Sequence, residues 1–107
     1  MTPASDDRVD AVFQALADPT RRELVRRLSE RPATVTELSA HVPITRQAVA
    51  KHMAALHEAG LIAAERQGRE VRYRLTPGPM ADAAGWMAKV GAQWDRRLEN
   101  LRRRFSR

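Results

Sequence analysis

The stretch that decides the fold runs from Thr34 to Leu61 and reads TVTELSAHVPITRQAVAKHMAALHEAGL. We expect two helices here, because Pro43 interrupts the helical pattern and Thr45 can cap the helix that follows. Gly60 suits the left-handed conformation that often ends a helix, so the second helix should stop there. Two helices separated by a turn as short as "VPIT" are typical of a helix-turn-helix. The apolar face of the second helix consists of Val49, Met53 and Leu56.

The polar face of that second helix is basic, carries one amide and is otherwise made of small side chains. It has no acidic residue before Glu58. In a major groove, Arg46 can reach guanine O6 and N7, and Gln47 can reach adenine N6 and N7. Ala50 lets the backbone approach the base edges, and Lys51, one turn further on, can contact a base or a phosphate. The pattern favours double-stranded DNA as the partner, with an ordinary solvated helix face as the alternative.

The sequence before this motif predicts two further helices. We expect a frayed tail over residues 1–6 and then a short first helix with an apolar stripe up to Leu16. The dipeptide at residues 18–19 begins the next helix, because an aspartate can cap it and a proline suits its first position. A threonine, Thr34 or Thr36, should cap the helix after that.

After Gly60 the apolar period changes from helical to two, which predicts a β-hairpin over about 61–76 with Gly68 in its turn. A last helix should then open at Pro79 and run to about residue 105. The predicted fold is therefore mainly α with a small β-hairpin, in one domain over residues 1–107. This order of about five helices plus a two-stranded wing, with the helix-turn-helix at about 34–60, is the layout of a winged helix-turn-helix.

The hairpin and the start of the second helix add candidate phosphate contacts. Thr45 can offer its hydroxyl and backbone N–H to a phosphate, where the helix N-terminus already favours an anion. A wing can place basic side chains along the phosphates or into the adjacent minor groove. A charged solvent face is the alternative for any one of these arginines, which are Arg66, Arg69, Arg72 and Arg74.

Bulk composition agrees with a nucleic-acid partner. The net charge of +6 favours a polyanion, with nucleic acid before an anionic membrane. The chain has no cysteine, which excludes disulfides and thiolate metal sites and fits a cytoplasmic protein. The N-terminal residues lack the apolar core of a signal peptide, and no apolar run is long enough to span a bilayer.

These segments together resemble the ArsR/SmtB family of prokaryotic winged-helix repressors. The matching stretches are LADPTRRELVRRL, the helix-turn-helix quoted above extended to Ile62, and GREVRYRLTP. The resemblance covers roughly residues 12–77, and the block AVxKHMxxLxxAGLI is its most specific part. It implies a homodimeric repressor that binds operator DNA and often releases it when an effector binds. It also implies that His52, at a position that is commonly histidine in the family, packs or contacts a phosphate.

The last predicted helix carries an apolar stripe with alternating spacings of four and three from Met80 to Phe105, which is a heptad seam. In the family, the first and last helices build the dimer interface. Gly91 within the seam indicates a close helix approach. Packing of the long helix on its own domain is the alternative. The residues expected at the interface are Phe13, Leu16, Met87, Gly91, Trp94, Leu98 and Leu101.

We expect no metal site, no cofactor and no enzymatic activity. Family sensors often hold metal on a cysteine pair in the third helix, where this chain has Ser39 and His41. His52 and His57 lie about 140° apart around a helix, too far apart to share an ion easily. No pattern brings a nucleophile, a base and an orienting group together. A protein–protein adaptor and a metal-responsive repressor with a non-cysteine site remain alternatives, and no effector can be named.

Overall fold

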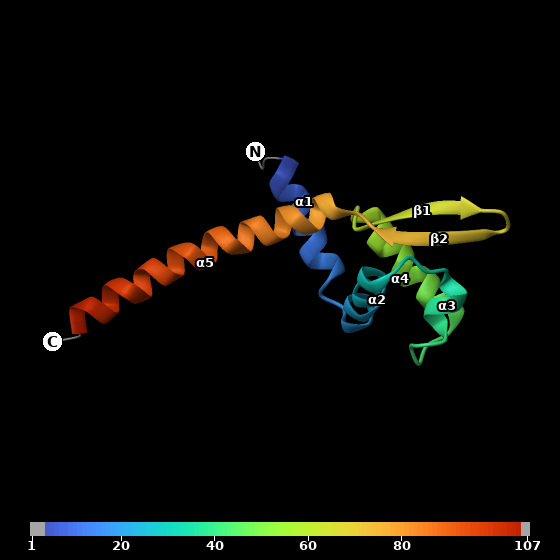
Figure 1. The fold of residues 1–107 in the computed structure, drawn as a ribbon, viewed down its shortest axis with the longest axis horizontal. Helices are drawn as coiled ribbons and strands as arrows, with labels where there is room; N and C mark the ends of the chain where they lie inside the picture. The colour runs from blue at the N-terminus through green and yellow to red at the C-terminus, as the bar shows by residue number, and fades with distance from the viewer. Residues whose placement is uncertain (1–3, 106–107) are drawn as a thin grey trace.

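The computed structural model describes residues 4–105 and confirms a winged helix-turn-helix (Figure 1). Four helices precede a hairpin, and one long helix follows it. The elements are α1 (Ala4–Ala15), α2 (Pro19–Glu30), α3 (Val35–Ser39), α4 (Arg46–Glu58), β1 (Ile62–Gln67), β2 (Glu70–Leu75) and α5 (Pro77–Phe105). Helix α1 begins at Ala4, so it reaches into the segment expected to be a frayed tail. Met1, Thr2 and Pro3 lie outside the described residues.

Side-chain caps fix where the middle helices begin. Asp18 caps α2, because its Oδ1 accepts the backbone N–H groups of Thr20 at 2.8 Å and Arg21 at 3.2 Å. Thr34 rather than Thr36 caps α3, and it forms a capping box with Glu37. In that box the Thr34 hydroxyl accepts the Glu37 N–H at 3.1 Å, and the Glu37 carboxylate accepts the Thr34 N–H at 2.8 Å.

The core lies where α1, α2, α3, α4 and the base of the hairpin meet. The predicted apolar face of α4 is fully buried, and the stripe of α2 packs beside it. Because α4 sits on this core by one face only, its opposite face is held out toward solvent in a fixed orientation. Among the described side chains, those with no exposed surface are Val12, Leu24, Val49, Met53, Leu56 and Leu61.

The wing is an antiparallel hairpin in which Ile62 pairs with Leu75 and Gln67 pairs with Glu70. Gly68 takes a φ of +65° in the turn, which glycine adopts without steric cost. One residue from outside the predicted two-stranded wing also pairs with it. Ala33 forms an isolated β-bridge with Tyr73, with N–H···O distances of 3.0 and 2.8 Å. This bridge ties the segment before α3 directly to β2.

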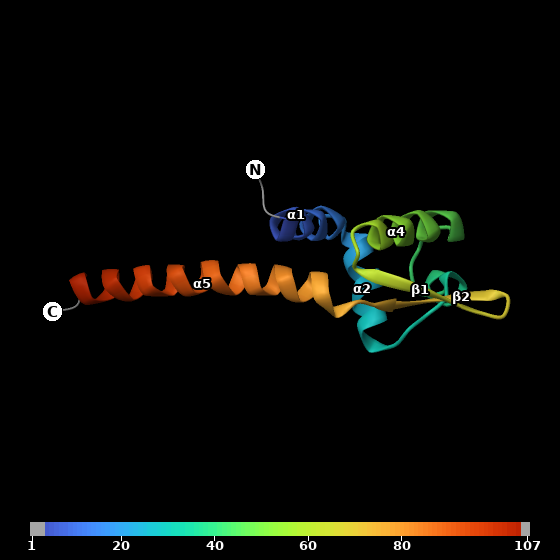
Figure 2. The same cartoon turned by 90° about the horizontal axis from the view of Figure 1, so that it is seen from above.

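Helix α5 begins at Pro77, two residues before the predicted start. Both Pro77 and Pro79 fit the first turn, because the backbone N–H groups there have no partner within the helix. The first turns of α5 pack on α1, and the remainder extends away from the domain (Figures 1 and 2). The molecule is accordingly long, at 67 × 33 × 20 Å. Within the described part of the chain, none of the helices combines the length and apolarity needed to cross a membrane.

Candidate nucleic-acid interface

The polar face of α4 is presented to solvent as a continuous surface. Arg46, Gln47, Ala50 and Lys51 are all exposed, and every one of them projects from the first two turns of the helix. The buried face of α4 on the core sets their direction, so this surface does not depend on a flexible loop. Its basic and amide groups are separated only by small side chains, which leaves the helix backbone accessible to a groove.

Thr45 stands at the N-terminus of α4 and is exposed. Its Oγ1 accepts the N–H of Ala48 at 3.1 Å, which leaves the hydroxyl proton free to be donated to another acceptor. The N–H groups of the first turn point the same way, so the start of α4 is a favourable place for an anionic oxygen.

His52 takes a different position from the exposed residues of α4. It is half-buried, and its charge interacts with Asp18 at the start of α2. Burial raises the pKa of Asp18, but the N–H groups of Arg21 and Thr20 outweigh that effect, and with the charges of His52 and Arg21 they hold this pKa below its usual range. His52 therefore lies between the α4 surface and the cap of α2.

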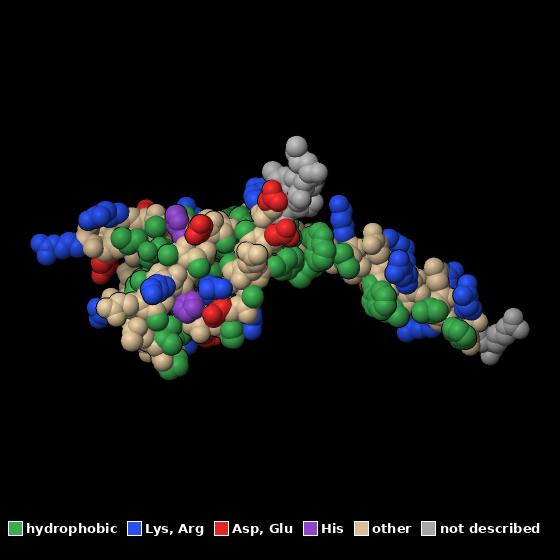
Figure 3. Space-filling model, turned by 180° about the vertical axis from the view of Figure 1, so that it is seen from behind, with side chains coloured by type: hydrophobic (Ala, Val, Ile, Leu, Met, Phe, Trp, Pro, Cys, Tyr) green, Lys and Arg blue, Asp and Glu red, His purple; other side chains and the backbone are tan. Residues whose placement is uncertain are grey.

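Three of the four wing arginines point to solvent. Arg66, Arg69 and Arg74 are exposed, and the Nε of Arg66 lies 3.4 Å from the carbonyl oxygen of Gly68 in the turn. Basic side chains are visible at the tip of the wing in Figure 3. These three arginines can move to meet phosphates because no carboxylate within the described residues holds them.

Arg72 differs from the other three because it is tied to α3. Its Nη1 lies 3.0 Å from the Glu37 carboxylate and 3.5 Å from the carbonyl oxygen of Pro32. Its Nη2 lies 3.6 Å from Glu70 on the same strand. The Thr34 N–H is the main cause of a lowered pKa of Glu37, against an opposing effect of burial, and Arg72 lowers it further. Arg72 therefore connects the wing to the helix-turn-helix.

Two further arginines, in the first turn of α2, have a structural role that their sequence positions alone do not reveal. The Nε of Arg21 donates to the carbonyl oxygen of Ala15 at 2.6 Å, and Nη1 of Arg22 donates to that of Leu16 at 2.6 Å. These carbonyls belong to the last residue of α1 and to the residue after it, where a helix leaves carbonyl groups without partners of its own. Two adjacent arginines, each six residues after the carbonyl that it contacts, are the sequence signal for such a cap.

Four of the residues expected at a dimer interface belong to an exposed apolar stripe along α5, namely Met87, Trp94, Leu98 and Leu101. Figure 3 shows hydrophobic side chains along one side of this helix and basic ones along the other. Phe13 of α1 lies at the beginning of the stripe, where its ring meets Trp86 edge-on at 5.7 Å. Leu16, in contrast, is half-buried against the core. The exposed members on α5 are Trp86, Met87, Val90, Trp94, Leu98, Leu101 and Phe105.

Gly91 lies in the middle of this stripe with open space around it. Apart from the adjacent backbone of α5 itself, a Cβ built at this position would meet no atom of the described residues within 4 Å. The glycine is therefore not required by packing inside the chain. Among residues 4–105, no group of three or more histidine, cysteine, aspartate or glutamate side chains is placed to hold a metal ion.

Comparison with known proteins agrees with this geometry. Residues 16–64 match a protein family described as a helix-turn-helix domain. An ArsR-like transcriptional regulator from Rhodococcus sp. RHA1 superimposes with a TM-score of 0.79 at 34% identity, over 96% of this chain and 97% of that one. The homodimeric winged helix-turn-helix DNA-binding domain of Mb0332 from Mycobacterium bovis, a possible ArsR-family transcriptional regulator, has a TM-score of 0.65 at 26% identity, over 88% and 84% of the two chains.

A curated relative is also a helix-turn-helix transcriptional regulator. The transcriptional regulator CmtR of Mycobacterium bovis is 38% identical over 77 residues, which are 72% of this chain and 65% of the relative. The chain thus spans just under two thirds of the length of that relative. The matching domain, the shared architecture over nearly the whole chain and this identity lead to one conclusion. The chain belongs to the ArsR family of winged helix-turn-helix transcriptional regulators.

Proposed function

We propose that this protein is a sequence-specific regulator that binds double-stranded DNA as a homodimer at a near-palindromic operator. The observation that carries the proposal is the exposed face of α4, which is free of carboxylates over its first three turns and rigidly backed by the core. A helix of this kind fits the major groove, and the second helix of a helix-turn-helix is the one presented there.

The residues in the first turns of α4 contact the base edges and so read the DNA sequence. Arg46 contacts a guanine and Gln47 an adenine, because both side chains have the paired donors or acceptors that those bases require. Ala50 permits the close approach, and Lys51 contacts a base or a phosphate. Thr45 binds a phosphate through its free hydroxyl proton, and half-buried His52 acts mainly through packing beside Asp18.

The arginines of the wing have two different roles, because some contact DNA and one holds the wing in position. Arg66, Arg69 and Arg74 contact phosphates or enter the adjacent minor groove, because their guanidinium groups are exposed. Arg72 belongs to the same candidate surface, but its ion pair with Glu37 supports a different role. It fixes the angle between the wing and the helix-turn-helix, so that both reach the duplex together.

The exposed stripe of α5 supports a symmetric dimer. A contiguous row of half-exposed aromatic and aliphatic side chains is unusual on a monomer and typical of an interface. The open space at Gly91 gives room for a partner helix to approach closely. A two-fold dimer would present two copies of α4 to two half-sites about one helical turn apart. The homodimeric Mb0332 domain offers a precedent for this assembly.

The family resemblance favours repression, since a dimer bound across a promoter prevents other proteins from occupying the same DNA. Such a protein acts on chromosomal DNA, and we therefore place it in the cytoplasm. An effector that releases the operator is compatible with the fold but is not required, because the level of the protein alone can control occupancy.

Titration of fluorescently labelled duplex DNA at several salt concentrations tests the proposal. Each phosphate neutralised by a basic residue contributes roughly −0.9 to the slope of log K against log salt. We expect steeply salt-dependent binding that is stronger for one selected sequence than for scrambled DNA. A protein–protein adaptor with this fold would bind neither duplex at moderate salt, and that result would overturn the proposal.

A further inference from the structure

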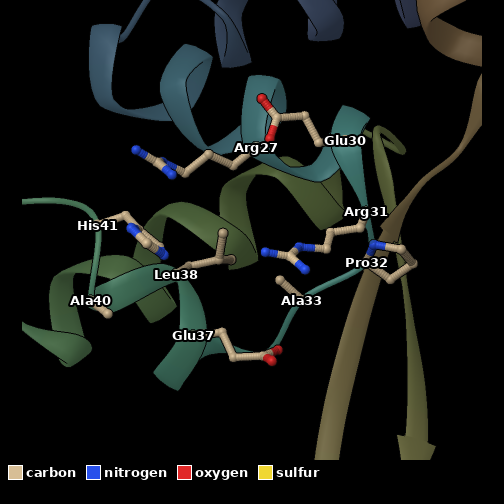
Figure 4. Close-up of a pocket in the computed structure, with 9 residues that line it drawn as sticks. All are labelled: Arg27, Glu30, Arg31, Pro32, Ala33, Glu37, Leu38, Ala40 and His41. Atoms are coloured by element: carbon tan, nitrogen blue, oxygen red, sulfur yellow. The ribbon is translucent and has the colours of Figure 1, made fainter.

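A cavity outside the DNA-facing surface lies between the end of α2 and α3. Its volume is about 340 Å³, which falls within the range of pockets that hold small molecules. Apolar side chains form the smaller part of its lining surface, and charged side chains form much of the rest (Figure 4). The apolar lining is Pro32, Ala33, Leu38 and Ala40, and the basic groups are Arg27, Arg31 and His41.

The two carboxylates at this cavity are engaged elsewhere. Glu30 forms an ion pair with Arg26 at 2.9 Å, outside the cavity. Glu37 accepts the N–H of the α3 cap and pairs with Arg72 at 3.0 Å. Figure 4 shows the carboxylates of Glu30 and Glu37 on opposite sides, with the Arg31 guanidinium between them beside Leu38. The negative charges at the rim are therefore already balanced by other cations.

The basic groups, in contrast, retain unused hydrogen-bond donors. The Nε of Arg27 is buried and has no hydrogen-bond partner, although Glu23 lies 3.3 Å away in a shared ion pair with Arg26. That atom has no surface open to the cavity, so only the outer nitrogens of the Arg27 guanidinium could meet a ligand. Within the described residues, the guanidinium of Arg31 takes part in no ion pair. A ligand carboxylate could therefore pair with Arg31 and with the outer nitrogens of Arg27.

We propose that this cavity binds a small organic acid, with its carboxylate between Arg27, Arg31 and His41 and its apolar body against Leu38 and Ala33. Guanidinium groups bind carboxylates through paired, charge-assisted hydrogen bonds. The apolar lining adds burial of the ligand body, which favours an organic acid over a bare inorganic anion.

The cavity also shares its wall with the two attachments of the wing. Glu37 holds Arg72, and Ala33 forms the β-bridge to Tyr73. A ligand that shifts Ala33 or Glu37 changes the position of the wing relative to α4. This consequence rests on the proposed DNA-binding function, whereas occupation of the cavity does not. The organic acid would then be an effector that alters operator affinity.

Ligand-observed NMR on the full chain without DNA tests occupation, with benzoate as the probe. Benzamide is the matched neutral probe, because it has the same ring and no negative charge. Loss of a charge-assisted interaction should weaken binding by about tenfold or more, so benzamide should bind correspondingly less well. Inorganic phosphate should compete only weakly, because it lacks an apolar body.

Two variants locate the site. Arg31→Gln should lower benzoate affinity by about tenfold, because it removes the guanidinium that faces the cavity. Ala40→Leu should block the cavity without altering charge, and the αR backbone of Ala40 accepts any side chain. Arg96→Gln on α5 is the control, since it makes the same charge change far from the cavity. Thermal melting checks that each variant is folded.

Saturable binding of benzoate that is lost in both cavity variants and kept in Arg96→Gln would support the proposal. Equal binding of benzoate and benzamide, or unchanged binding in Arg31→Gln, would overturn it. A loss of DNA affinity in Arg31→Gln with no benzoate binding by the wild type would also overturn it, because Arg31 would then contact a DNA phosphate. Addition of benzoate should change operator affinity in the wild type and in Arg96→Gln but not in the two cavity variants, and an unchanged operator affinity in the wild type would refute the effector role.

Discussion

Replacing Trp94 and Leu98 by aspartate should convert the protein to a monomer. These side chains are 57% and 47% exposed in the single chain, so about half of each remains to be buried by a partner. Full burial of a large apolar side chain stabilises by about 1.5–3 kcal/mol, so each exposed half is worth roughly 0.7–1.5 kcal/mol. A two-fold symmetric dimer buries two such side chains from each protomer, and these four together contribute roughly 3–6 kcal/mol to the free energy of dimerisation.

That energy corresponds to a loss of roughly 10²–10⁴-fold in the dimerisation constant. The aspartates should weaken association further, because their charges would have to leave water. Sedimentation velocity across a micromolar concentration series measures the change. The variant should bind the operator weakly, since the second recognition helix is no longer tethered nearby.

Gln93→Asp with Asn100→Asp provides the matched control. It adds the same charge to α5 but outside the apolar stripe, so this protein should remain dimeric. Circular dichroism should show that both double variants keep the helical domain. A wild type that is monomeric at micromolar concentration would refute the reasoning, as would a Trp94 and Leu98 variant that stays dimeric.

Three further changes test the other parts of the account. Arg46→Ala or Gln47→Ala should weaken operator binding by about 1–3 kcal/mol and relax the preference at one base position. Selection of preferred sequences from random DNA by each variant measures this, and an unchanged preference would mean that α4 does not read the bases. Arg74→Gln should lower the slope of log K against log salt by about one unit for all DNA sequences. Arg72→Gln should in addition increase the exchange broadening of the wing resonances in NMR spectra. If the two variants gave the same slope and the same broadening, Arg72 would have no positioning role. Glu37 has a pKa below its ordinary 4.5, so its contribution to stability is fully present above pH 4.5 and is lost as the pH falls through the folded pKa. The melting-temperature difference between wild type and Glu37→Gln should therefore shrink on acidification, and a difference that grew would contradict this sign.

Local features of the sequence were sufficient to predict most of the fold. The burial of Val49 and Met53 follows from helical spacing alone, and the cap at Asp18 follows from one side chain reaching amides two and three residues away. The candidate DNA-contacting surface of α4 could be predicted for the same reason. In a regular helix, the residues that face solvent are known once the residues of the buried face are known.

Features that depend on distant segments could not be predicted in this way. Arg72 reads as one more basic residue of the wing, because its partner Glu37 is 35 residues away and the pairing requires the hairpin to fold against α3. The bridge between Ala33 and Tyr73 has the same origin. The start of α5 was misplaced because Pro77 and Pro79 are both compatible with a first turn, and only the path of the chain after β2 distinguishes them.

We propose above that two copies of α4 in a symmetric dimer read DNA sequence. Selection of duplexes from a random pool by the purified wild-type protein, followed by sequencing of the bound fraction, measures this directly. We expect an enriched near-palindrome whose two half-sites lie about one helical turn apart. Enrichment of no sequence, or of a single half-site without two-fold symmetry, would contradict it.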